Sequence, residues 1–362
     1  MPRVLLSGYY GFGNVGDEAI LQAVVEALTA ARDDVEIGVL SATPQETAAA
    51  YNVRAFHRAW PTSVLLAIRW ADLVLSGGGG LLQDATSPLS PLYYLGVLRL
   101  AQALRRKTMV LAQGLGPLTS PRNVRAVKAV FARTQAVTVR DAASAEWLRS
   151  MGHVAPEPRV TGDLALLLRP RPTGCIPREA RCLSDGSRPA VGLAFRPWRD
   201  APHDLTARLA HLAGRVAAET DAVALLLPFH PSVDLGLCEA VRQRAPDHAI
   251  VLREPLRPDE VLALVGRVDA IIGMRLHALI FAAISGTPFL AVSYDPKVDA
   301  FVEAVAGTIA CTIADFDPDE VVERLRGLWP RRAEAGARLA THARVARCDA
   351  ERAIQTALSL LE

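Results

Sequence analysis

The sequence predicts an α/β protein made of two Rossmann-like halves that face a cleft. Short β-branched and apolar runs alternate with helical patterns along most of the 362 residues. This alternation is typical of parallel sheets with crossover helices. It is interrupted once, at residues 169–189, where proline, glycine and charged residues concentrate as they do in interdomain linkers. A chain of this length also suits two domains.

Residues 1–168 are predicted to form the N-terminal Rossmann-like domain, followed by the linker at 169–189. Helical patterns at residues 18–31 and 122–134 separate apolar runs that have the length of strands. The strands are expected at residues 4–8, 35–40, 73–76, 109–113 and 136–139.

Residues 190–330 repeat the alternation and are predicted to form the C-terminal Rossmann-like domain. The strands are expected at residues 190–195, 223–228, 250–252, 270–273 and 289–293. The helices are expected at residues 205–220, 233–244, 258–265 and 277–285. The tail, residues 331–362, continues a helical pattern that Pro330 must break or kink. Ligands of open parallel sheets bind at the carboxyl ends of the strands, so both halves are expected to present those ends to the cleft.

Composition narrows the functional class. The formal net charge is only +2, which argues against nucleic acid as a partner because binding it needs a basic face. The five cysteines are scattered without zinc-ligand or redox spacing, which indicates a reducing cytoplasm and no metal site. No signal peptide and no apolar run of about 18 residues is found, so we expect a cytoplasmic protein.

A basic run at residues 99–107 follows an apolar segment at 89–98. The favoured interpretation is the solvated end of a helix. The alternative is peripheral contact with anionic lipid head groups at the inner membrane face.

Residues 11–16 match the G-x-G-x-x-G pattern directly after the first predicted strand. Two features argue against a dinucleotide. Asp17 and Glu18 stand at the helix start, where they would repel a pyrophosphate, and the second strand ends without an acidic residue for a ribose. Two interpretations remain. One is a tight strand-to-helix turn. The other is a polyol site, such as a sugar site, with hydrogen bonds from Tyr9, Asn14, Asp17 and Glu18.

Four consecutive glycines at residues 77–80 follow the predicted strand at 73–76. Such a run loses much backbone entropy on folding and is tolerated where backbone approaches a ligand or a neighbouring loop closely. A ligand-facing loop is favoured over packing alone. Gly78, Gly79 and Asp84 are therefore predicted to contact the ligand.

Cationic and titratable side chains follow several strands of the second half. Arg196, His230, Arg275, His277 and Lys297 all fall at predicted carboxyl ends. Each has a bland alternative: a hydrogen-bonded loop histidine, a surface arginine, a solvated lysine. Their coincidence favours a site for a small anion that is protonated as it reacts. His277 opens a helix, whose amides favour neutral imidazole, whereas a bound dianion would favour its charged form.

The chain resembles the polysaccharide pyruvyl transferase family, and most closely its CsaB type. The resemblance rests on motifs at residues 8–19, 77–80, 139–144, 273–277 and 293–297. It implies a glycosyltransferase-B-like fold and phosphoenolpyruvate as donor. The product would be a 4,6-ketal of pyruvate on N-acetylmannosamine in a secondary cell-wall polysaccharide precursor, which serves to anchor surface-layer proteins. The acceptor would be a lipid-linked saccharide, which brings the enzyme to the membrane.

Combined with the strand-end residues, the resemblance predicts the roles of individual side chains. His277 is expected to be the general acid, and Asp17 or Glu18 the base on the acceptor side. No metal or cofactor is expected. The phosphoenolpyruvate site is expected to comprise Arg196, His230, Arg275, Leu276 and Lys297. The acceptor site is expected to comprise Tyr9, Asn14, Gly78, Gly79 and Asp84.

Two other functions compete with this prediction. A nucleotide-sugar-dependent glycosyltransferase or epimerase of the same fold would usually offer a glutamate to a ribose after a glycine-rich turn. Here residues 286–288 lead instead to the segment 294–297, which contains Lys297. A module that only binds the glycan would leave His277 and the cations around it unexplained.

Overall fold

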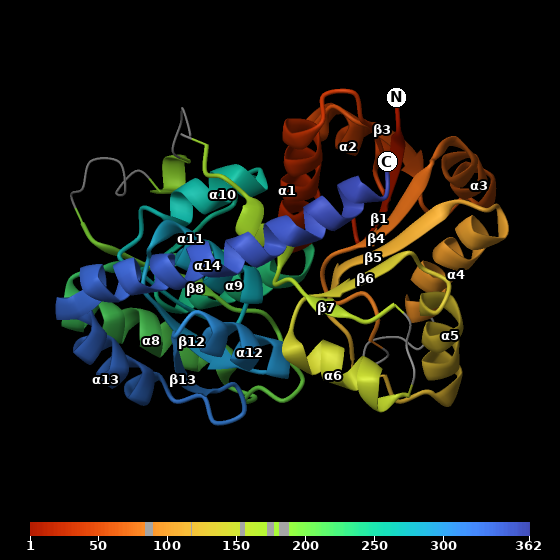
Figure 1. Cartoon of the computed structure of the whole chain (residues 1–362). Coiled ribbons are helices and arrows are strands. Elements are labelled where there is room, and N and C mark those ends of the chain that lie inside the picture. Colours follow the sequence, from red (N-terminus) through yellow and green to blue (C-terminus); the bar gives the residue numbers. More distant parts are fainter. Residues whose placement is uncertain (84–89, 117, 153–155, 172–176, 181–187) are drawn as a thin grey trace. The chain divides into compact units, whose positions relative to one another are not determined.

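The computed structural model describes residues 1–83, 90–116, 118–152, 156–171, 177–180 and 188–362 (Figure 1). The chain forms two compact units. The first contains residues 1–168 together with 346–362, and the second contains residues 169–345. Each unit has its own parallel sheet with helices on its faces, which confirms the predicted α/β class with two Rossmann-like parts.

The sheet of the first unit has the order β3-β2-β1-β4-β5-β6-β7, and all its pairings are parallel. Its strands are β1 (Arg3–Ser7), β2 (Glu36–Ser41), β3 (Arg54–His57), β4 (Leu73–Gly77), β5 (Lys107–Gln113), β6 (Ala136–Val139) and β7 (Arg159–Val160). The central strands are apolar on both faces, as expected for strands covered by helices on both sides.

The helices of the first unit are α1 (Val15–Ala31), α2 (Pro44–Tyr51), α3 (Pro61–Trp70), α4 (Ser90–Ala103), α5 (Pro121–Phe131) and α6 (Ala142–Ser150). Proline occupies the first turn of α2, α3 and α5, where its missing N–H costs nothing. The side chain of Asp141 caps α6, and Arg140 beside it forms buried ion pairs with Asp141 and Asp163. Arg140 therefore has a structural role.

The sheet of the second unit has the order β10-β9-β8-β11-β12-β13, again parallel throughout. Its strands are β8 (Ala190–Ala194), β9 (Val223–Leu226), β10 (Ala249–Val251), β11 (Ala270–Gly273), β12 (Phe289–Ser293) and β13 (Thr308–Thr312). Its helices are α8 (Leu205–Thr220), α9 (Pro231–Arg244), α10 (Pro258–Val265), α11 (Leu276–Ser285), α12 (Pro296–Ala304) and α13 (Pro318–Leu328).

The C-terminal tail is helical, as predicted. A 3₁₀ turn at Trp329–Arg331, which contains Pro330, separates α13 from the long helix α14 (Arg332–Ser359). This break confirms the effect expected of the proline. Residues 332–345 of α14 belong to the second unit, and residues 346–359 belong to the first.

In each sheet the order of the strands reverses at one point. The candidate sites lie beside these two points. In the first unit the reversal falls between β1 and β4, and in the second between β8 and β11. In open α/β sheets the loops that leave two such adjacent strands run to opposite faces of the sheet, and this point generally marks a ligand crevice at the carboxyl edge.

The long apolar strands were predicted, whereas three others were not. β7 has only two residues, and β3 and β13 carry few buried side chains. Strands of this kind lack the apolar run on which the prediction depends. No helix among the residues that the structure describes is long and apolar enough to span a membrane.

The basic run at residues 99–107 covers the end of α4 and the start of β5. Arg106 donates a hydrogen bond to the carbonyl oxygen of Arg69, and Lys107 donates one to the carbonyl oxygen of Leu360. These contacts engage two of the basic side chains with backbone of the same unit, and the solvated helix end remains a prediction. Contact with lipid remains a prediction.

Candidate functional site

Two arginines of the second unit flank the β8/β11 crevice. Arg196 follows β8 and Arg275 follows β11. The backbone amides of Met274 and Arg275 both donate to the carbonyl oxygen of Ala194, at 3.0 and 3.3 Å. A Cβ on Gly273 would lie 2.6 Å from that same oxygen, so only glycine permits this approach. The ends of the two strands are thus held together, and the arginines with them.

Asp234 fixes the Arg275 guanidinium. The Nε atom of Arg275 lies 3.0 Å from Asp234 Oδ2, and Nη2 donates a second hydrogen bond to Oδ1. The Oδ2 atom also accepts a hydrogen bond from the His230 backbone amide at 2.9 Å. Asp234 has no exposed surface and Arg275 is 8% exposed, so the pair is buried. Asp234 therefore joins the loops after β9 and β11.

Sequence reasoning missed Asp234. Its signal was an acidic residue in the first turn of α9, four positions after His230 at a strand end. First-turn acids usually complement the helix dipole at the surface. Only the fold reveals that this one is buried against an arginine from another loop.

The Arg196 guanidinium is half-buried and incompletely paired. Its Nε atom has no hydrogen-bond partner among the described residues. Burial lowers the pKa of Arg196, and the nearby Arg275 charge lowers it further, whereas Tyr294 and Asp234 oppose the change. The protein thus holds two positive charges close together with one shared carboxylate. This arrangement favours an incoming anion.

Aromatic rings connect Arg196 to Lys297. The Arg196 guanidinium lies 5.3 Å from the ring centroid of Trp198, which meets the Tyr294 ring edge-on at 4.7 Å. The Lys297 ammonium lies 5.2 Å from the Tyr294 ring and 3.1 Å from Asp295 Oδ2. Arg196, Arg275 and Lys297 are therefore grouped around Tyr294, Trp198 and Asp234.

Helix α11 begins directly after Arg275. Arg275 occupies the N-cap position, but no side chain caps the helix there. Leu276 is buried and His277 is half-buried. Amides at a helix start bind anions readily, because they carry the positive end of the helix dipole. The predicted acid thus stands in the first turn of a helix that starts at the arginine pair.

In the first unit, the loops after β1 and β4 meet at Asp17. Asn14 caps α1 by accepting from the Gly16 amide, and its Nδ2 atom donates to Asp17 Oδ2 at 2.5 Å. A Cβ on Gly79 would lie 2.8 Å from Asp17 Oδ1, and Gly79 has a positive φ of 76°. Gly78 packs as closely on Ile20. The glycine run therefore lets backbone approach the start of α1.

Glu18 fills the turn of the G-x-G-x-x-G segment. Its Oε1 atom accepts from the Gly11 amide at 2.7 Å, and the backbone of Phe12 and Gly13 also hydrogen-bonds the carboxylate. Its Oε2 atom accepts from the Tyr51 hydroxyl at 3.2 Å. Burial raises the pKa of Glu18 despite these contacts. The amides that would receive a pyrophosphate are thus already engaged by the protein's own carboxylate.

An aromatic group surrounds Arg58 at the same sheet edge. The rings of Tyr9 and Phe12 stack at 4.1 Å, and the Arg58 guanidinium lies 4.9 Å from Phe12 and 4.5 Å from Tyr93. Arg58 also donates to the Tyr94 hydroxyl at 3.3 Å. Phe12 stays 37% exposed. Stacked rings beside Asn14 and Asp17 offer an apolar face next to hydrogen-bonding groups, which suits a sugar ring.

Sequence reasoning missed Phe12 and Arg58. Phe12 stands inside the glycine motif, so an exposed aromatic side chain in a ligand-facing turn was an available signal. Arg58 follows the short strand β3, which was itself not predicted. Asp84, predicted to bind the acceptor, lies outside the described residues. No group of three His, Cys, Asp or Glu side chains that could hold a metal ion occurs within the part of the chain that the structure describes.

Comparison with known sequences identifies relatives of the chain. The family model described as polysaccharide pyruvyl transferase matches residues 14–296. The chain is also similar to the amylovoran biosynthesis protein AmsJ of Erwinia amylovora, with 20% identity over 82% of this chain and 84% of AmsJ.

Solved structures with a similar fold include proteins bound to UDP or UDP-GlcNAc. HepE of Anabaena, solved with UDP and glucose, superposes with a TM-score of 0.63 and 13% identity, covering 99% of this chain and 100% of HepE. MnaA of S. aureus, solved with UDP, superposes with a TM-score of 0.65 and 13% identity, covering 95% of this chain and 94% of MnaA. The UDP-GlcNAc 2-epimerase of Neisseria meningitidis superposes with a TM-score of 0.59 and 12% identity, covering 96% of this chain and 99% of the epimerase. At these identities the likeness confirms the predicted glycosyltransferase-B-like fold class and nothing beyond it.

Proposed function

The chain belongs to the polysaccharide pyruvyl transferase family, and from this premise we propose that it takes its pyruvyl group from phosphoenolpyruvate. Membership makes it a transferase that acts by pyruvyl transfer in polysaccharide biosynthesis. The donor, the acceptor and the residues that handle them are the substance of the proposal.

The Arg196–Arg275 pair supports the donor assignment. Phosphoenolpyruvate carries about three negative charges near neutral pH, on a carboxylate and a phosphate. Arg196 is half-buried, its Nε atom lacks a hydrogen-bond partner within the described part of the chain, and its pKa is lowered by burial and by Arg275. A multiply charged anion relieves that repulsion, and guanidinium groups match carboxylate and phosphate oxygens in pairs. Lys297 adds a point charge, and His230 and Leu276 complete the proposed donor site.

His277 is proposed as the general acid. The enol phosphate of phosphoenolpyruvate reacts once its methylene carbon is protonated, and an imidazole titrates in the right pH range to supply the proton. The carbon that bears the phosphate then becomes electrophilic. A hydroxyl of the acceptor sugar attacks it and loses its proton to a base. The C–O bond to phosphate breaks, and a second sugar hydroxyl closes the ketal.

The atoms and charges of this scheme balance. Two hydroxyl protons are released, one replaces the proton that His277 delivers to carbon, and the other leaves on hydrogen phosphate. The methylene carbon becomes the methyl group of the ketal, whose carboxylate keeps one negative charge. Substrate and products carry the same total charge, and no electron transfer occurs.

Asp17 is the better candidate for the acceptor-side base. Glu18 already accepts hydrogen bonds from Gly11, Phe12, Gly13 and Tyr51, which assigns it to holding the turn. Asp17 lies beside Asn14 and Gly79 at the crevice of the first sheet. We propose that Tyr9, Asn14, Gly78 and Gly79, with Phe12, bind the acceptor sugar.

The finer identity of the acceptor rests on the resemblance to CsaB-type sequences. We propose a 4,6-ketal on an N-acetylmannosamine-type residue of a lipid-linked precursor of a secondary cell-wall polysaccharide, which serves surface-layer anchoring. Such an acceptor would bring the enzyme to the cytoplasmic face of the membrane. The predicted domain roles follow, with donor residues in the second unit and acceptor residues in the first.

Mass spectrometry tests the reaction directly. A synthetic lipid-linked disaccharide is incubated with enzyme and phosphoenolpyruvate, and parallel reactions receive a uridine diphosphate sugar instead. We expect the mass gain of one pyruvate ketal and equimolar phosphate, only with phosphoenolpyruvate. Glycosyl transfer or epimerisation with the nucleotide sugar, without ketal formation, would replace the proposal by the competing function.

A further inference from the structure

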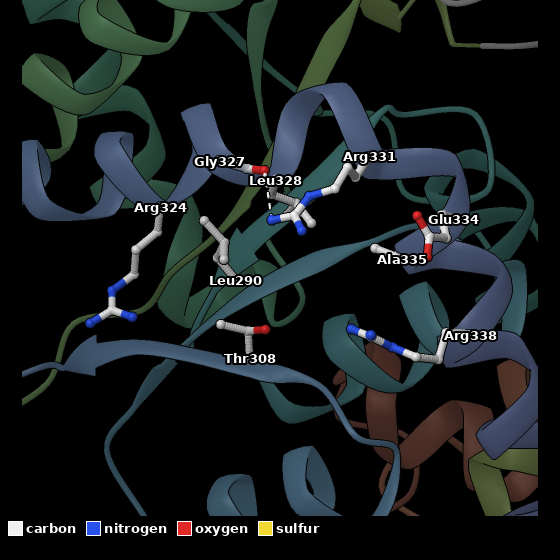
Figure 2. A pocket seen from close by; sticks show the side chains of 9 residues that line it. All are labelled: Leu290, Thr308, Arg324, Gly327, Leu328, Arg331, Glu334, Ala335 and Arg338. Atoms are coloured by element: carbon white, nitrogen blue, oxygen red, sulfur yellow. Dashed lines mark hydrogen bonds between the residues drawn. The ribbon is translucent and has the colours of Figure 1, made fainter.

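A second basic site lies at the opposite edge of the sheet in the second unit. A cavity of about 270 Å³ is lined by Leu290, Thr308, Arg324, Gly327, Leu328, Arg331, Glu334, Ala335 and Arg338 (Figure 2). We call it the arginine pocket. Leu290 stands near the start of β12 and Thr308 begins β13. Because the strands are parallel, the pocket lies at the amino edge, whereas Arg196 and Arg275 follow the carboxyl ends.

Three arginines reach this pocket from three consecutive elements. Arg324 comes from α13, Arg331 from the 3₁₀ turn and Arg338 from α14. In Figure 2 their side chains lie around Leu290 and Thr308, with Glu334 on the side of α14. Three guanidinium groups and one carboxylate give the lining an excess of positive charge.

Charge pairing separates Arg331 and Arg338 from arginines near them, whereas Arg324, which also lines the pocket, pairs with Glu320. Arg326 binds Glu219 and Glu323, and Arg332 binds Asp269. In contrast, Arg331 and Arg338 form no ion pair with any residue that the structure describes. Among the described residues, Arg331 donates a hydrogen bond only to the Gly327 carbonyl oxygen, at 3.3 Å. Two of the three arginines that line the cavity thus have no carboxylate partner in the part of the chain that the structure describes.

The walls of the pocket are held in place. A Cβ on Gly336 would lie 1.9 Å from the carbonyl oxygen of Gly286, so α14 rests directly on the end of α11. Arg332 donates to the Trp329 carbonyl oxygen at 3.0 Å and covers its ring at 4.8 Å, which fixes the 3₁₀ turn. Leu290 in the lining is 1% exposed. The backbone that carries the pocket is therefore packed in place, whereas the side chains of Arg331 and Arg338 are exposed.

We propose that the arginine pocket binds a small anion that carries a phosphate or diphosphate group, held by Arg331 and Arg338. Guanidinium groups bind phosphate oxygens in pairs, and the Thr308 hydroxyl adds a further donor. The volume is below the range of about 300–1,000 Å³ typical of sites for larger ligands, which favours a compact anion over a nucleotide. The proposal is independent of the donor and acceptor sites.

Isothermal titration of the full chain with diphosphate at low ionic strength tests the proposal. We compare the wild type with Arg331→Gln/Arg338→Gln, with Arg344→Gln and with Arg196→Met. Arg344 is the matched control, because it is exposed on the same helix and does not line the pocket. The double variant should weaken binding by about tenfold or more, whereas Arg344→Gln should keep it. Arg196→Met should leave the part of the binding that depends on Arg331 and Arg338.

A second variant tests the cavity without a change of charge. Ala335→Phe fills part of the pocket and should also weaken diphosphate binding, while circular dichroism and the melting temperature confirm folding. Absence of diphosphate binding in the wild type would overturn the proposal. So would binding that Arg196→Met removes and the pocket variants keep, because the anion would then occupy the other edge of the sheet.

Vesicles distinguish a soluble anion from a lipid head group. The wild type is sedimented with phosphatidylglycerol vesicles and with phosphatidylcholine vesicles. If the pocket binds a small soluble anion, the wild type and the Arg331→Gln/Arg338→Gln variant should sediment with vesicles to the same extent. The opposite outcome is a wild type that sediments with phosphatidylglycerol vesicles, loses this binding in the double variant, and releases no heat on titration with diphosphate. That combination would show that the pocket binds a membrane surface and not a soluble anion.

Discussion

Arg275 and Asp234, which are 41 residues apart in the chain, form a buried ion pair through Nε–Oδ2 at 3.0 Å and a second hydrogen bond from Nη2 to Oδ1. The carboxylate sets the direction of the guanidinium and connects it to the His230 loop. Burying an ion pair of this kind costs desolvation free energy, so the pair contributes little to the net free energy of unfolding. Removing one partner is nevertheless strongly destabilising, because the other charge stays buried and unpaired. Asp234 is therefore a positioning residue for the proposed donor site.

Asp234→Ala should destabilise the protein strongly. The change leaves the buried Arg275 guanidinium without its carboxylate, which costs about 3–5 kcal/mol of the free energy of unfolding. Urea denaturation measures it. Glu239→Ala is the control, because the Glu239–Arg253 pair is exposed and should contribute about 1 kcal/mol or less. Equal decreases of the free energy of unfolding in Asp234→Ala and Glu239→Ala would show that the buried Asp234–Arg275 pair is no more important for stability than an exposed pair.

Arg196→Met should weaken phosphoenolpyruvate binding about tenfold or more without loss of stability. The folded state disfavours the Arg196 charge, since its pKa is lowered by burial and by Arg275. Removing the charge therefore relieves repulsion while the methionine keeps the packing. Calorimetric donor titration and thermal unfolding are measured together. Arg199→Met is the matched control: Arg199 covers the same Trp198 ring at 5.9 Å but is exposed and paired with Asp200. If both variants bind donor normally, the anion site lies elsewhere.

The cations at the strand ends could be predicted from the sequence, whereas their partners could not. The position of Arg196 and Arg275 follows from apolar runs that end at polar residues, combined with the general rule for parallel sheets. Their interaction with Asp234 depends on which loops meet at the crevice, and hence on strand order. The residues joined are far apart in the chain, and no local pattern encodes that contact.

The same distinction holds in the first unit. The glycine run at 77–80 indicated close backbone approach, and the structure shows the approach of Gly79 to Asp17. The sequence alone left Glu18 as an alternative base, because a first-turn acid can face either solvent or its own turn. Side-chain geometry assigns it to the turn. Arg58 escaped prediction with its strand β3, which is short and poorly buried.

His277→Asn should reduce ketal formation by about 10²–10⁴-fold, the usual contribution of a general acid. Donor affinity should stay within a few-fold of the wild type, because the arginine pair remains. Phosphate release in the presence of acceptor and calorimetric donor binding are compared in the same preparation. His203→Ala, at an exposed position of the same unit, serves as control. Wild-type turnover in His277→Asn would exclude its role as the acid.

Glu18→Gln should change how stability depends on pH. Because the pKa of Glu18 is raised in the folded chain, the folded state holds the proton more tightly than the unfolded state. This contribution to stability is fully present below about the ordinary value of 4.5 and is lost as pH rises through the raised pKa. The wild type should therefore lose stability relative to Glu18→Gln over that window, as measured by urea denaturation at a series of pH values. Glu46→Gln, at an exposed position of α2, controls for the loss of a surface carboxylate. A pH-independent difference in the free energy of unfolding between the wild type and Glu18→Gln would contradict the buried carboxylate.

Phe12→Ala should raise the apparent KM for the acceptor and leave the donor unaffected. The Phe12 ring is 37% exposed although it stacks on Tyr9 and lies 4.9 Å from the Arg58 guanidinium. An aromatic side chain left open beside Asn14 and Asp17 offers the apolar face that a sugar ring can cover, and its loss should cost about tenfold. Initial rates are measured while each substrate is varied in turn. Trp60→Ala is the control, since Trp60 is 63% exposed in the same unit and stacks on His57 instead. A change in the donor KM with a constant acceptor KM would place the sugar elsewhere and leave Phe12 as part of the packing around Arg58.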